Sequence, residues 1–96
     1  MSEERQRVDV WLFRTRLVKT RAAAARLVGE GGVRLVREGA ARRLEKPSAE
    51  VAAGDTLILP VRGSLRSVRV LGLGERRGPA AEARGLYDEL DADAFA

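Results

Sequence analysis

Positively charged side chains gather around one short segment near the start of the sequence. The run Lys19-Thr20-Arg21 brings two cations and a hydroxyl together, and Arg7 and Arg16 flank it with few acidic residues between. Guanidinium groups hold phosphate oxygens through paired hydrogen bonds, and a hydroxyl and the exposed amides of a helix N-terminus orient them. A solvated face of a basic protein is the alternative, but the clustering favours a phosphate-binding site.

Further basic residues follow on a segment that is predicted to form a β-hairpin. Their side chains would lengthen the cationic surface if the hairpin lies beside the helices. Of the 18 basic residues, 16 are arginines, which suits bidentate contacts to phosphates and bases, although a genome rich in arginine codons would give the same composition. The hairpin candidates are Arg34, Arg42, Arg43 and Lys46.

Other chemistries find less support in the sequence. The chain contains no cysteine and no histidine, which excludes disulfides, thiolate nucleophiles, Cys/His zinc sites and histidine acid–base catalysis. Asp9 has no second polar catalytic group beside it, so we expect it to cap the first helix. Trp11 and Phe13 could stack on bases, but they lie on apolar helix stripes and are expected to pack in the core. We therefore predict a protein that is not an enzyme and that uses no cofactor or metal.

Charge is distributed unevenly along the 96 residues, whose formal net charge is +4. Residues 1–46 hold 12 basic and 6 acidic side chains, whereas residues 80–96 hold 1 and 5. A basic N-terminal half favours a polyanionic partner on one side of the molecule. The polar N-terminus and the lack of a long apolar run argue against a signal peptide and a membrane span, so we expect a cytoplasmic protein.

Two helices and a small sheet are predicted to position these side chains. The first helix starts at Asp9, and the second starts after Thr20 and ends at Gly31-Gly32. Pro79 begins a last helix, with apolar residues at helical spacing as far as Leu90. The fold class is therefore α+β, with two N-terminal helices packed on a small, mostly antiparallel sheet plus a C-terminal helix. Strands are predicted at 33–36, 41–45, 56–59 and 67–73.

Several short motifs occur in a definite order along the chain. The first set is Arg7-Val8-Asp9, Lys19-Thr20-Arg21, Ala24, Gly31-Gly32-Val33 and Gly54-Asp55. In this order they resemble the S-four RNA-binding domain family, named after a small-subunit ribosomal protein. A second set is similar to the bacterial heat-shock protein fifteen branch of that family, and together the two sets reach nearly the whole chain. This second set is Asp9–Phe13, Lys46-Pro47-Ser48, Arg76–Ala83 and Leu86-Tyr87.

The resemblance implies a use for the candidate residues. Family members bind structured RNA through the helix–turn–helix edge and the hairpin, and members of the branch are thought to bind the free large ribosomal subunit carrying a stalled nascent chain. One departure from the family pattern is the hairpin connection, Val36–Leu44, which is expected to be longer than the usual short turn. The RNA contacts implied by position are Arg7, Lys19, Thr20, Arg21, Arg34 and Lys46, and Arg16, Arg42 and Arg43 are added from charge.

The predicted function is binding of ribosomal RNA of the large subunit, in recycling or quality control of stalled nascent-chain complexes. We expect structured RNA as the partner, with transfer RNA as a further one, only weak binding of DNA, no membrane association and a monomeric protein. Residues 7–60 would form the RNA-binding domain, and residues 61–90 would complete it with a strand and the last helix. Residues 1–6 would be a flexible lead-in, and residues 91–96 an acidic tail.

Two other functions fit parts of the sequence. A helix-turn-helix DNA-binding protein would also use two helices and a turn, but a recognition helix that contains Ala22–Ala25 offers few side chains for reading bases. An RNA-binding accessory of an RNA-modifying enzyme is the third reading, because such domains are often appended to these enzymes. The chain itself has no room for a catalytic domain and no convincing acid–base pair.

Overall fold

The computed structural model of the protein describes residues 4–90, and these residues form three helices and seven strands. Five strands make one sheet in the order β3-β2-β5-β6-β7, and β1 pairs with β4 in a small second sheet. In chain order the elements are β1 (Gln6–Arg7), α1 (Val8–Arg14), α2 (Arg21–Gly29), β2 (Arg34–Arg37), β3 (Ala40–Arg43), β4 (Glu50–Val51), β5 (Thr56–Val61), β6 (Ser64–Val70), α3 (Ala80–Arg84) and β7 (Tyr87–Leu90).

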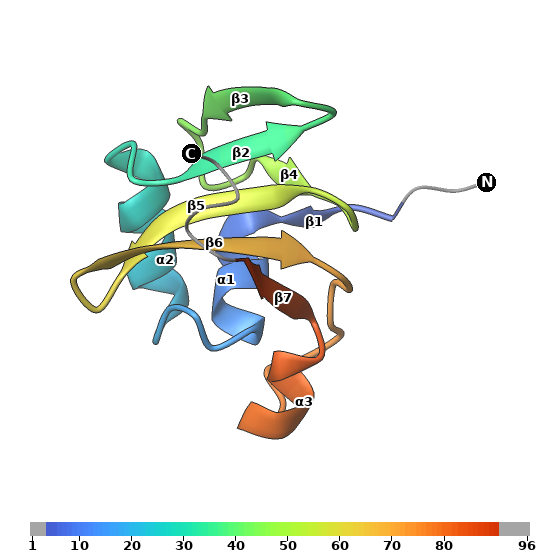
Figure 1. Cartoon of the computed structure of the whole chain (residues 1–96). Coiled ribbons are helices and arrows are strands. Elements are labelled where there is room, and N and C mark those ends of the chain that lie inside the picture. Colours follow the sequence, from blue (N-terminus) through green and yellow to red (C-terminus); the bar gives the residue numbers. More distant parts are fainter. Residues whose placement is uncertain (1–3, 91–96) are drawn as a thin grey trace.

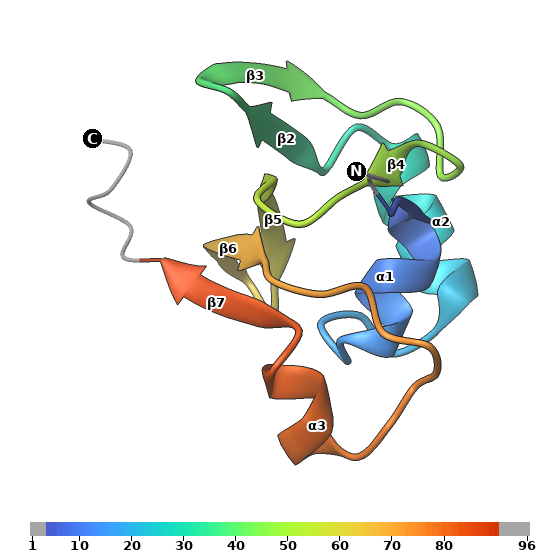
Figure 2. The same cartoon turned by 90° about the vertical axis from the view of Figure 1, so that its right-hand side faces the viewer.

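The helices α1 and α2 pack together against one face of the five-stranded sheet (Figures 1 and 2). Leu35, Leu57 and Val68 lie opposite one another on neighbouring strands and are buried, which places the apolar side of the sheet toward these helices. Trp11 from α1 and Val28 from α2 are fully buried in the same core. Every strand pairing in the described residues is antiparallel. The predicted α+β fold class is confirmed.

The second helix begins and ends as the sequence predicted. Thr20 is the N-cap residue of α2, and its hydroxyl accepts a hydrogen bond from the amide of Ala23 at 3.0 Å. At the other end, Gly31 has a φ of 78°, a left-handed conformation that glycine adopts without a steric penalty. The amide of Gly31 donates to the carbonyl of Val28 at 2.9 Å, and this bond closes the helix.

The first helix differs from the prediction at both ends. It begins at Val8, and its N-cap residue Arg7 makes no side-chain capping bond. Asp9 lies within the first turn, so the prediction that Asp9 caps this helix was wrong. The helix ends at Arg14, yet Leu17 in the connection to α2 remains 8% exposed and belongs to the core. The connection is therefore held by packing rather than by continued helix.

Two tight hairpins shape the sheet. In the β2–β3 hairpin the turn residues Glu38 and Gly39 have φ values of 52° and 81°, and in the β5–β6 hairpin Arg62 and Gly63 have 52° and 82°. Positive φ at both central residues is the signature of the type I′ turn, whose twist matches that of the strands. The β2–β3 connection is thus a two-residue turn, and the expectation of a longer Val36–Leu44 connection was wrong.

The C-terminal part of the described chain is mostly strand, where a helix was predicted as far as Leu90. The helix α3 covers only Ala80–Arg84, and Tyr87–Leu90 forms β7, which pairs with β6. A helix of five residues is marginal on its own, whereas a strand gains a ladder of hydrogen bonds with β6. The residues that complete the domain after position 61 are therefore two strands and one short helix.

The start of the described chain is tied into the fold. Gln6 pairs with Val51 in the small sheet, and its side-chain amide donates to the carbonyl of Gly74 at 3.1 Å. Gln6, the last residue of the predicted flexible lead-in over residues 1–6, therefore lies in a strand. Residues 1–3 of that lead-in and the predicted acidic tail, 91–96, lie outside the described residues.

Candidate nucleic-acid interface

Asp9 is a buried carboxylate on which two arginines converge. Only 3% of its surface is exposed. The Nε and Nη2 of Arg7 donate to its Oδ1 and Oδ2 at 3.1 and 3.0 Å, and the amide of Val10 donates to Oδ1 at 2.8 Å. The Nη2 of Arg21 lies 3.9 Å from Oδ2. One carboxylate thus holds a guanidinium from β1 and another from α2, while the two arginine side chains keep 50% and 55% of their surface exposed.

The turn before α2 presents the remaining groups of the predicted Lys19-Thr20-Arg21 site. All three residues are exposed. Thr20 uses its hydroxyl to cap α2, which leaves the amides of Arg21 and Ala22 as donors at the start of the helix, where the helix dipole favours an anion. The role of Thr20 is therefore to orient the first turn of α2.

Lys46 is carried toward the same place by its loop. The carbonyl of Pro47 accepts a hydrogen bond from the amide of Asp9 at 3.4 Å, and that of Ala49 accepts one from Val8 at 2.7 Å. The loop therefore packs on the N-terminus of α1 next to Asp9, and the exposed Lys46 at its start also lines a shallow depression with Arg42 and Arg43. We call this set the turn surface, and its members are Arg7, Lys19, Thr20, Arg21 and Lys46.

Arg16 lies outside this set. It has a φ of 63°, which points its backbone away from the helical path, and its Nε donates to the carbonyl of Gly78 at 2.7 Å. The prediction placed Arg16 with Lys19 around one site. The structure joins it to the segment that precedes α3.

The three arginines of the β2–β3 hairpin are divided between the two faces of the sheet. Arg34 and Arg43 lie opposite each other on the two strands, with the reverse alternation to the buried Leu35. Arg42 lies opposite Leu35 and is exposed at the edge. The Cδ of Arg43 lies 2.9 Å from the position that a Cβ on Gly31 would occupy, at the C-terminal end of α2. Arg43 is therefore separated from the N-terminus of α2 by the length of that helix, about 13 Å.

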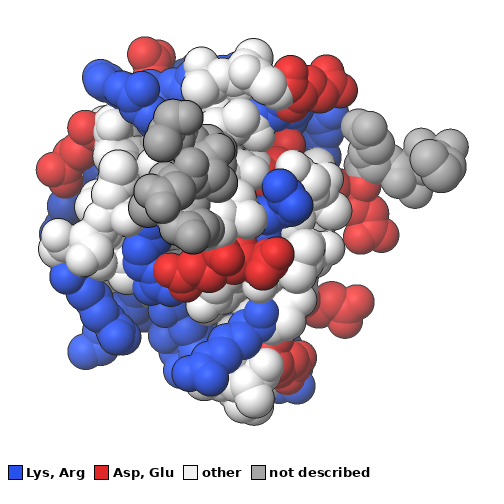
Figure 3. All heavy atoms as spheres, in the orientation of Figure 1, with Lys and Arg blue, Asp and Glu red and all other residues white. Residues whose placement is uncertain are grey.

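Charged side chains of both signs occur on the molecular face shown in Figure 3. Basic atoms cover more of the lower part of this face, where Figure 1 places the α1–α2 connection and α3. Each of these ion pairs of the described residues joins an arginine to an aspartate or glutamate. Asp9 is the one carboxylate among them that pairs with two arginines. The candidate interface is thus a cationic area around one buried carboxylate, with the hairpin arginines as a second area.

Of the two aromatic residues of α1, Trp11 packs in the core as predicted, whereas Phe13 lies outside the core, so the prediction for Phe13 was wrong. Trp11 is fully buried, donates from its Nε1 to the carbonyl of Gly72 at 2.7 Å, and meets the ring of Tyr87 edge-on at 6.5 Å. Phe13 is half-buried, and the guanidinium of Arg77 lies 4.8 Å above its ring. Neither ring is available as an open stacking platform.

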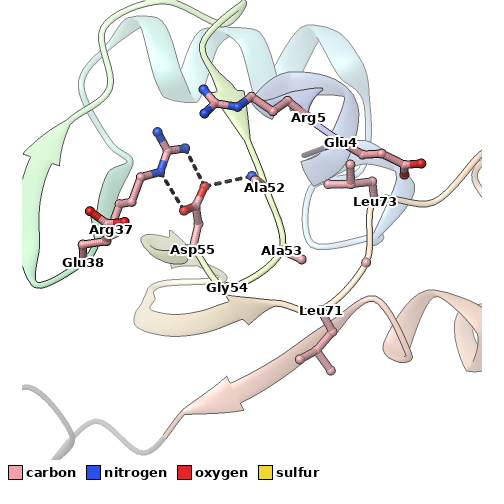
Figure 4. Close-up of a pocket in the computed structure, with 11 residues that line it drawn as sticks. Glu4, Arg5, Arg37, Glu38, Ala52, Ala53, Gly54, Asp55, Leu71 and Leu73 are labelled. Atoms are coloured by element: carbon pink, nitrogen blue, oxygen red, sulfur yellow. Dashed lines mark hydrogen bonds and ion pairs between the residues drawn. The ribbon is translucent and has the colours of Figure 1, made fainter. Parts of the chain in front are cut away.

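A second buried carboxylate, Asp55, was not predicted as a site residue. It accepts hydrogen bonds from Arg37 Nε and Nη2 at 2.8 and 2.7 Å and from the amide of Ala52 at 2.8 Å (Figure 4). Burial disfavours its charged form, but the hydrogen bonds from Arg37 and Ala52 outweigh burial and lower its pKa below 3.8. These bonds fix the turn at Gly54, so Asp55 has a structural role beside a depression of about 570 Å³.

Two kinds of feature are absent from the described residues. No group of three or more histidine, cysteine, aspartate or glutamate side chains lies close enough together there to hold a metal ion. No helix in residues 4–90 is long and apolar enough to cross a membrane.

Sequence reasoning found the cations of the turn surface but missed the function of Asp9. The signal was present in the motif Arg7-Val8-Asp9, because a carboxylate two residues after an arginine can reach it. Its burial depends on the loop that carries Lys46, and that loop is distant in sequence. The sequence also grouped Arg16 with the turn, since it could not show that Gly78 lies nearby.

Comparisons with known proteins give relatives of one kind. Heat shock protein 15 of Escherichia coli strain K12 is 37% identical over 83 residues, which cover 86% of this chain and 59% of the relative. The Haemophilus influenzae homologue of heat shock protein 15 is 31% identical over 91 residues, which cover 95% of this chain and 66% of the relative. The chain thus spans about three fifths of the length of the E. coli relative. No protein-family model matches the sequence.

A solved structure extends the likeness to three dimensions. Heat shock protein 15 of Vibrio cholerae, described as trimeric, superimposes with a TM-score of 0.80 and 30% identity, over 96% of this chain and 87% of that one. Because this likeness covers nearly all of both chains, it concerns the whole arrangement of helices and strands rather than a shared motif. The chain belongs to the heat shock protein 15 family.

Proposed function

We propose that this protein is an RNA-binding protein without enzymatic activity, and that it holds RNA phosphates on the turn surface. The observation that carries the proposal is the arrangement at Asp9. A buried carboxylate accepts two hydrogen bonds from Arg7 and lies 3.9 Å from the Nη2 of Arg21, beside the exposed Lys19 and the N-terminus of α2. Oriented guanidiniums, an ammonium and helix amides are the groups that bind phosphate oxygens best.

The arrangement favours phosphates over other anions for a geometric reason. Arg7 and Arg21 each direct part of the guanidinium at Asp9 and keep about half of the side chain exposed, so each retains donors for a second anion. A backbone with regularly spaced phosphates can engage both arginines and Lys19 at once. A single small carboxylate can engage only one or two of them.

We further propose ribosomal RNA of the large subunit as the target, in recycling or quality control of stalled complexes, with transfer RNA as a further partner. Support comes from the motif resemblance to S-four domains and from membership in the heat shock protein 15 family. Because the chain spans about three fifths of the E. coli relative, any contribution from other parts of such a protein is outside this proposal. A cytoplasmic location, weak binding of DNA and no membrane association belong to the same proposal.

We retain a monomer as part of the proposal, although the Vibrio cholerae structure is described as trimeric. The large apolar side chains exposed in the described residues are Leu65 and Leu71, and they lie at opposite ends of β6. They do not form one continuous apolar patch of the kind that stable interfaces use. Light scattering on the purified protein measures the oligomeric state directly.

Salt-dependent RNA binding tests the proposed function. We expect the protein to bind a structured fragment of large-subunit ribosomal RNA more tightly than duplex DNA at equal salt. Lys19→Ala and Arg21→Ala should each lower the slope of log K against log salt by about 0.9, which corresponds to one lost phosphate contact. Arg69→Gln is the matched control, because Arg69 is exposed on the face of the sheet away from the helices.

Three results would contradict the proposal. Unchanged slopes in both variants would show that the turn surface makes no phosphate contact. Tighter binding to palindromic duplex DNA, with a dimeric footprint, would favour the helix-turn-helix alternative. Chemical change in the RNA after incubation with the purified chain would show catalysis.

A further inference from the structure

The segment that links β6 to α3, residues 71–79, runs along α1 and is attached to it by hydrogen bonds (Figure 2). Its first part is held from the N-terminal half of the helix, where Trp11 donates to Gly72. Its second part is held at the C-terminal end of α1 by three arginines. These are Arg14, Arg16 and Arg77, which we call the arginine cluster.

The members of the arginine cluster converge on a small area. The Nη1 of Arg14 donates to the carbonyl of Gly74 at 2.7 Å, and the Nε of Arg16 donates to that of Gly78 at 2.7 Å. The Nε of Arg77 donates to the carbonyl of Phe13 at 3.2 Å, and the backbone amide of Arg16 donates to the same oxygen at 3.1 Å. The three guanidiniums therefore surround the last turn of α1.

All three hydrogen-bond acceptors are neutral carbonyl oxygens. Five other arginines in the described residues pair with carboxylates, whereas the members of the arginine cluster form no ion pair with any described carboxylate. Three positive charges thus lie together without an ion pair of their own inside residues 4–90, while the nearby Glu82 carboxylate, which lies against Gly78, pairs with Arg76. The arginines that have carboxylate partners are Arg7, Arg21, Arg37, Arg66 and Arg76.

The same hydrogen bonds leave most donors of the cluster unused. A guanidinium carries about five N–H donors, and each of the three makes a single hydrogen bond to the described part of the chain. The Cζ of Arg77 also lies over the Phe13 ring, 4.8 Å from its centre, and this contact restricts the position of the guanidinium. Arg16 is exposed, and Arg14 and Arg77 are half-buried.

We propose that the arginine cluster is a second phosphate-binding site, which takes RNA backbone phosphates next to those on the turn surface. The inference rests on the proposed function and extends it to a part of the chain that the S-four motifs do not include. Arg16 and Lys19 lie on the same connection between α1 and α2, so one RNA strand can pass from the turn surface to the cluster. The segment 71–79 thereby forms one wall of the interface as well as a link to α3.

A purely structural explanation also has support, since cations stabilise the negative C-terminal end of a helix. It predicts an effect on folding and none on the salt dependence of RNA binding. For Arg16 the site proposal predicts a change in the salt dependence of RNA binding and little effect on folding. Arg16 is exposed and makes one side-chain hydrogen bond to the segment. The salt slope therefore separates the two explanations.

The test measures binding of the full chain to a structured fragment of large-subunit ribosomal RNA by fluorescence anisotropy at several salt concentrations. We expect Arg16→Gln and Arg77→Gln each to lower the slope by about 0.9 and to weaken binding at low salt on the order of 3- to 10-fold. Arg77→Lys loses the planar guanidinium over Phe13 but keeps the positive charge. Because the salt slope depends on the charge, this variant should keep the wild-type slope. Arg69→Gln removes a charge of equal size on the other face of the sheet. It should keep both the wild-type salt slope and the wild-type affinity at low salt.

The outcomes separate failure of the cluster from failure of the proposed function. If Arg16→Gln and Arg77→Gln keep the wild-type slope while Lys19→Ala lowers it, the cluster is structural and RNA binding stands. If Arg69→Gln lowers the slope as much, net charge explains the effect and the cluster is no site. If the wild-type protein binds no RNA, both proposals fail. Should Arg77→Gln lose its folded circular dichroism spectrum, Arg16→Gln decides alone.

Discussion

Replacing Asp9 by asparagine separates two explanations of the proposed RNA binding that otherwise give the same result. If binding depends only on net charge, Asp9→Asn should bind RNA more tightly, because it removes a negative charge next to the turn surface. If binding depends on the fixed positions of Arg7 and Arg21, the variant should bind less tightly. The opposite signs make this substitution more informative than the loss of any single cation.

The expected size follows from the contacts of Asp9. Its carboxylate orients two arginine side chains, and ordering one such side chain on binding costs about 0.5–1.5 kcal/mol. Losing the order of both therefore weakens binding by about 1–3 kcal/mol. The removed charge offsets at most about 1 kcal/mol, the interaction of two charges about 4 Å apart in water. Taking the middle of that range, about 2 kcal/mol, less the offset of about 1 kcal/mol leaves about 1 kcal/mol, so we expect a net loss of about 5-fold in affinity.

The assay compares Asp9→Asn with Glu45→Gln, which removes the same charge from an exposed residue beside Lys46. Glu45→Gln should bind RNA as well as the wild type or slightly better. Urea melts should show that Asp9→Asn remains folded with a loss of about 1–2 kcal/mol, since the bonds from Arg7 are charge-assisted but half exposed. RNA affinity equal to or above that of the wild type, in a folded Asp9→Asn protein, would refute the positioning role of Asp9.

Two further predictions concern stability. The pKa of Asp55 is lower in the folded protein than its ordinary 3.8. The contribution of its carboxylate to the free energy of unfolding is therefore complete above about pH 4 and is lost as the pH falls through the folded pKa. Denaturant melts between neutral pH and about pH 2.5 should therefore show the wild type losing its advantage over Asp55→Asn, and a constant difference would contradict the role of the Arg37 pair. Glu38→Asn should stabilise the protein by about 0.5–1 kcal/mol, because asparagine tolerates the positive φ of this type I′ turn better; a lower thermal midpoint would contradict it.

The parts of the fold that could be predicted are those that local chemistry decides. The two ends of α2 were predicted correctly from Thr20 before the alanine run and Gly31 after it. A capping hydroxyl and a left-handed glycine act within one turn of the chain. Strands such as β5 were predicted because a short apolar run bounded by turn residues is typical of a buried strand. In each case the interaction that decides the structure lies within a few residues of the signal.

The C-terminal error shows where local pattern fails. Leu86, Tyr87 and Leu90 have helical spacing, yet Gly85 ends α3 and the next residues pair with β6. Tyr87 then reaches the edge of Trp11, and Glu89 pairs with Arg66. The partners of this segment are distant in sequence, so its own periodicity could not reveal that a strand is more stable than a helix here.

The candidate site shows the same division between local and distant information. Residue types predicted a phosphate site at Lys19-Thr20-Arg21, because charge and capping are properties of the residues themselves. The order within the site depends on Asp9, whose burial requires the loop near Pro47, and the reach of the cationic area depends on Arg77, which meets α1 across more than sixty positions. A cation can therefore be recognised from sequence, but its orientation depends on acceptors that only folding brings near. If the proposed RNA binding holds, we expect the acceptors at Asp9 and at the Phe13 carbonyl to distinguish arginines that bind phosphates in a fixed geometry from arginines that only add charge.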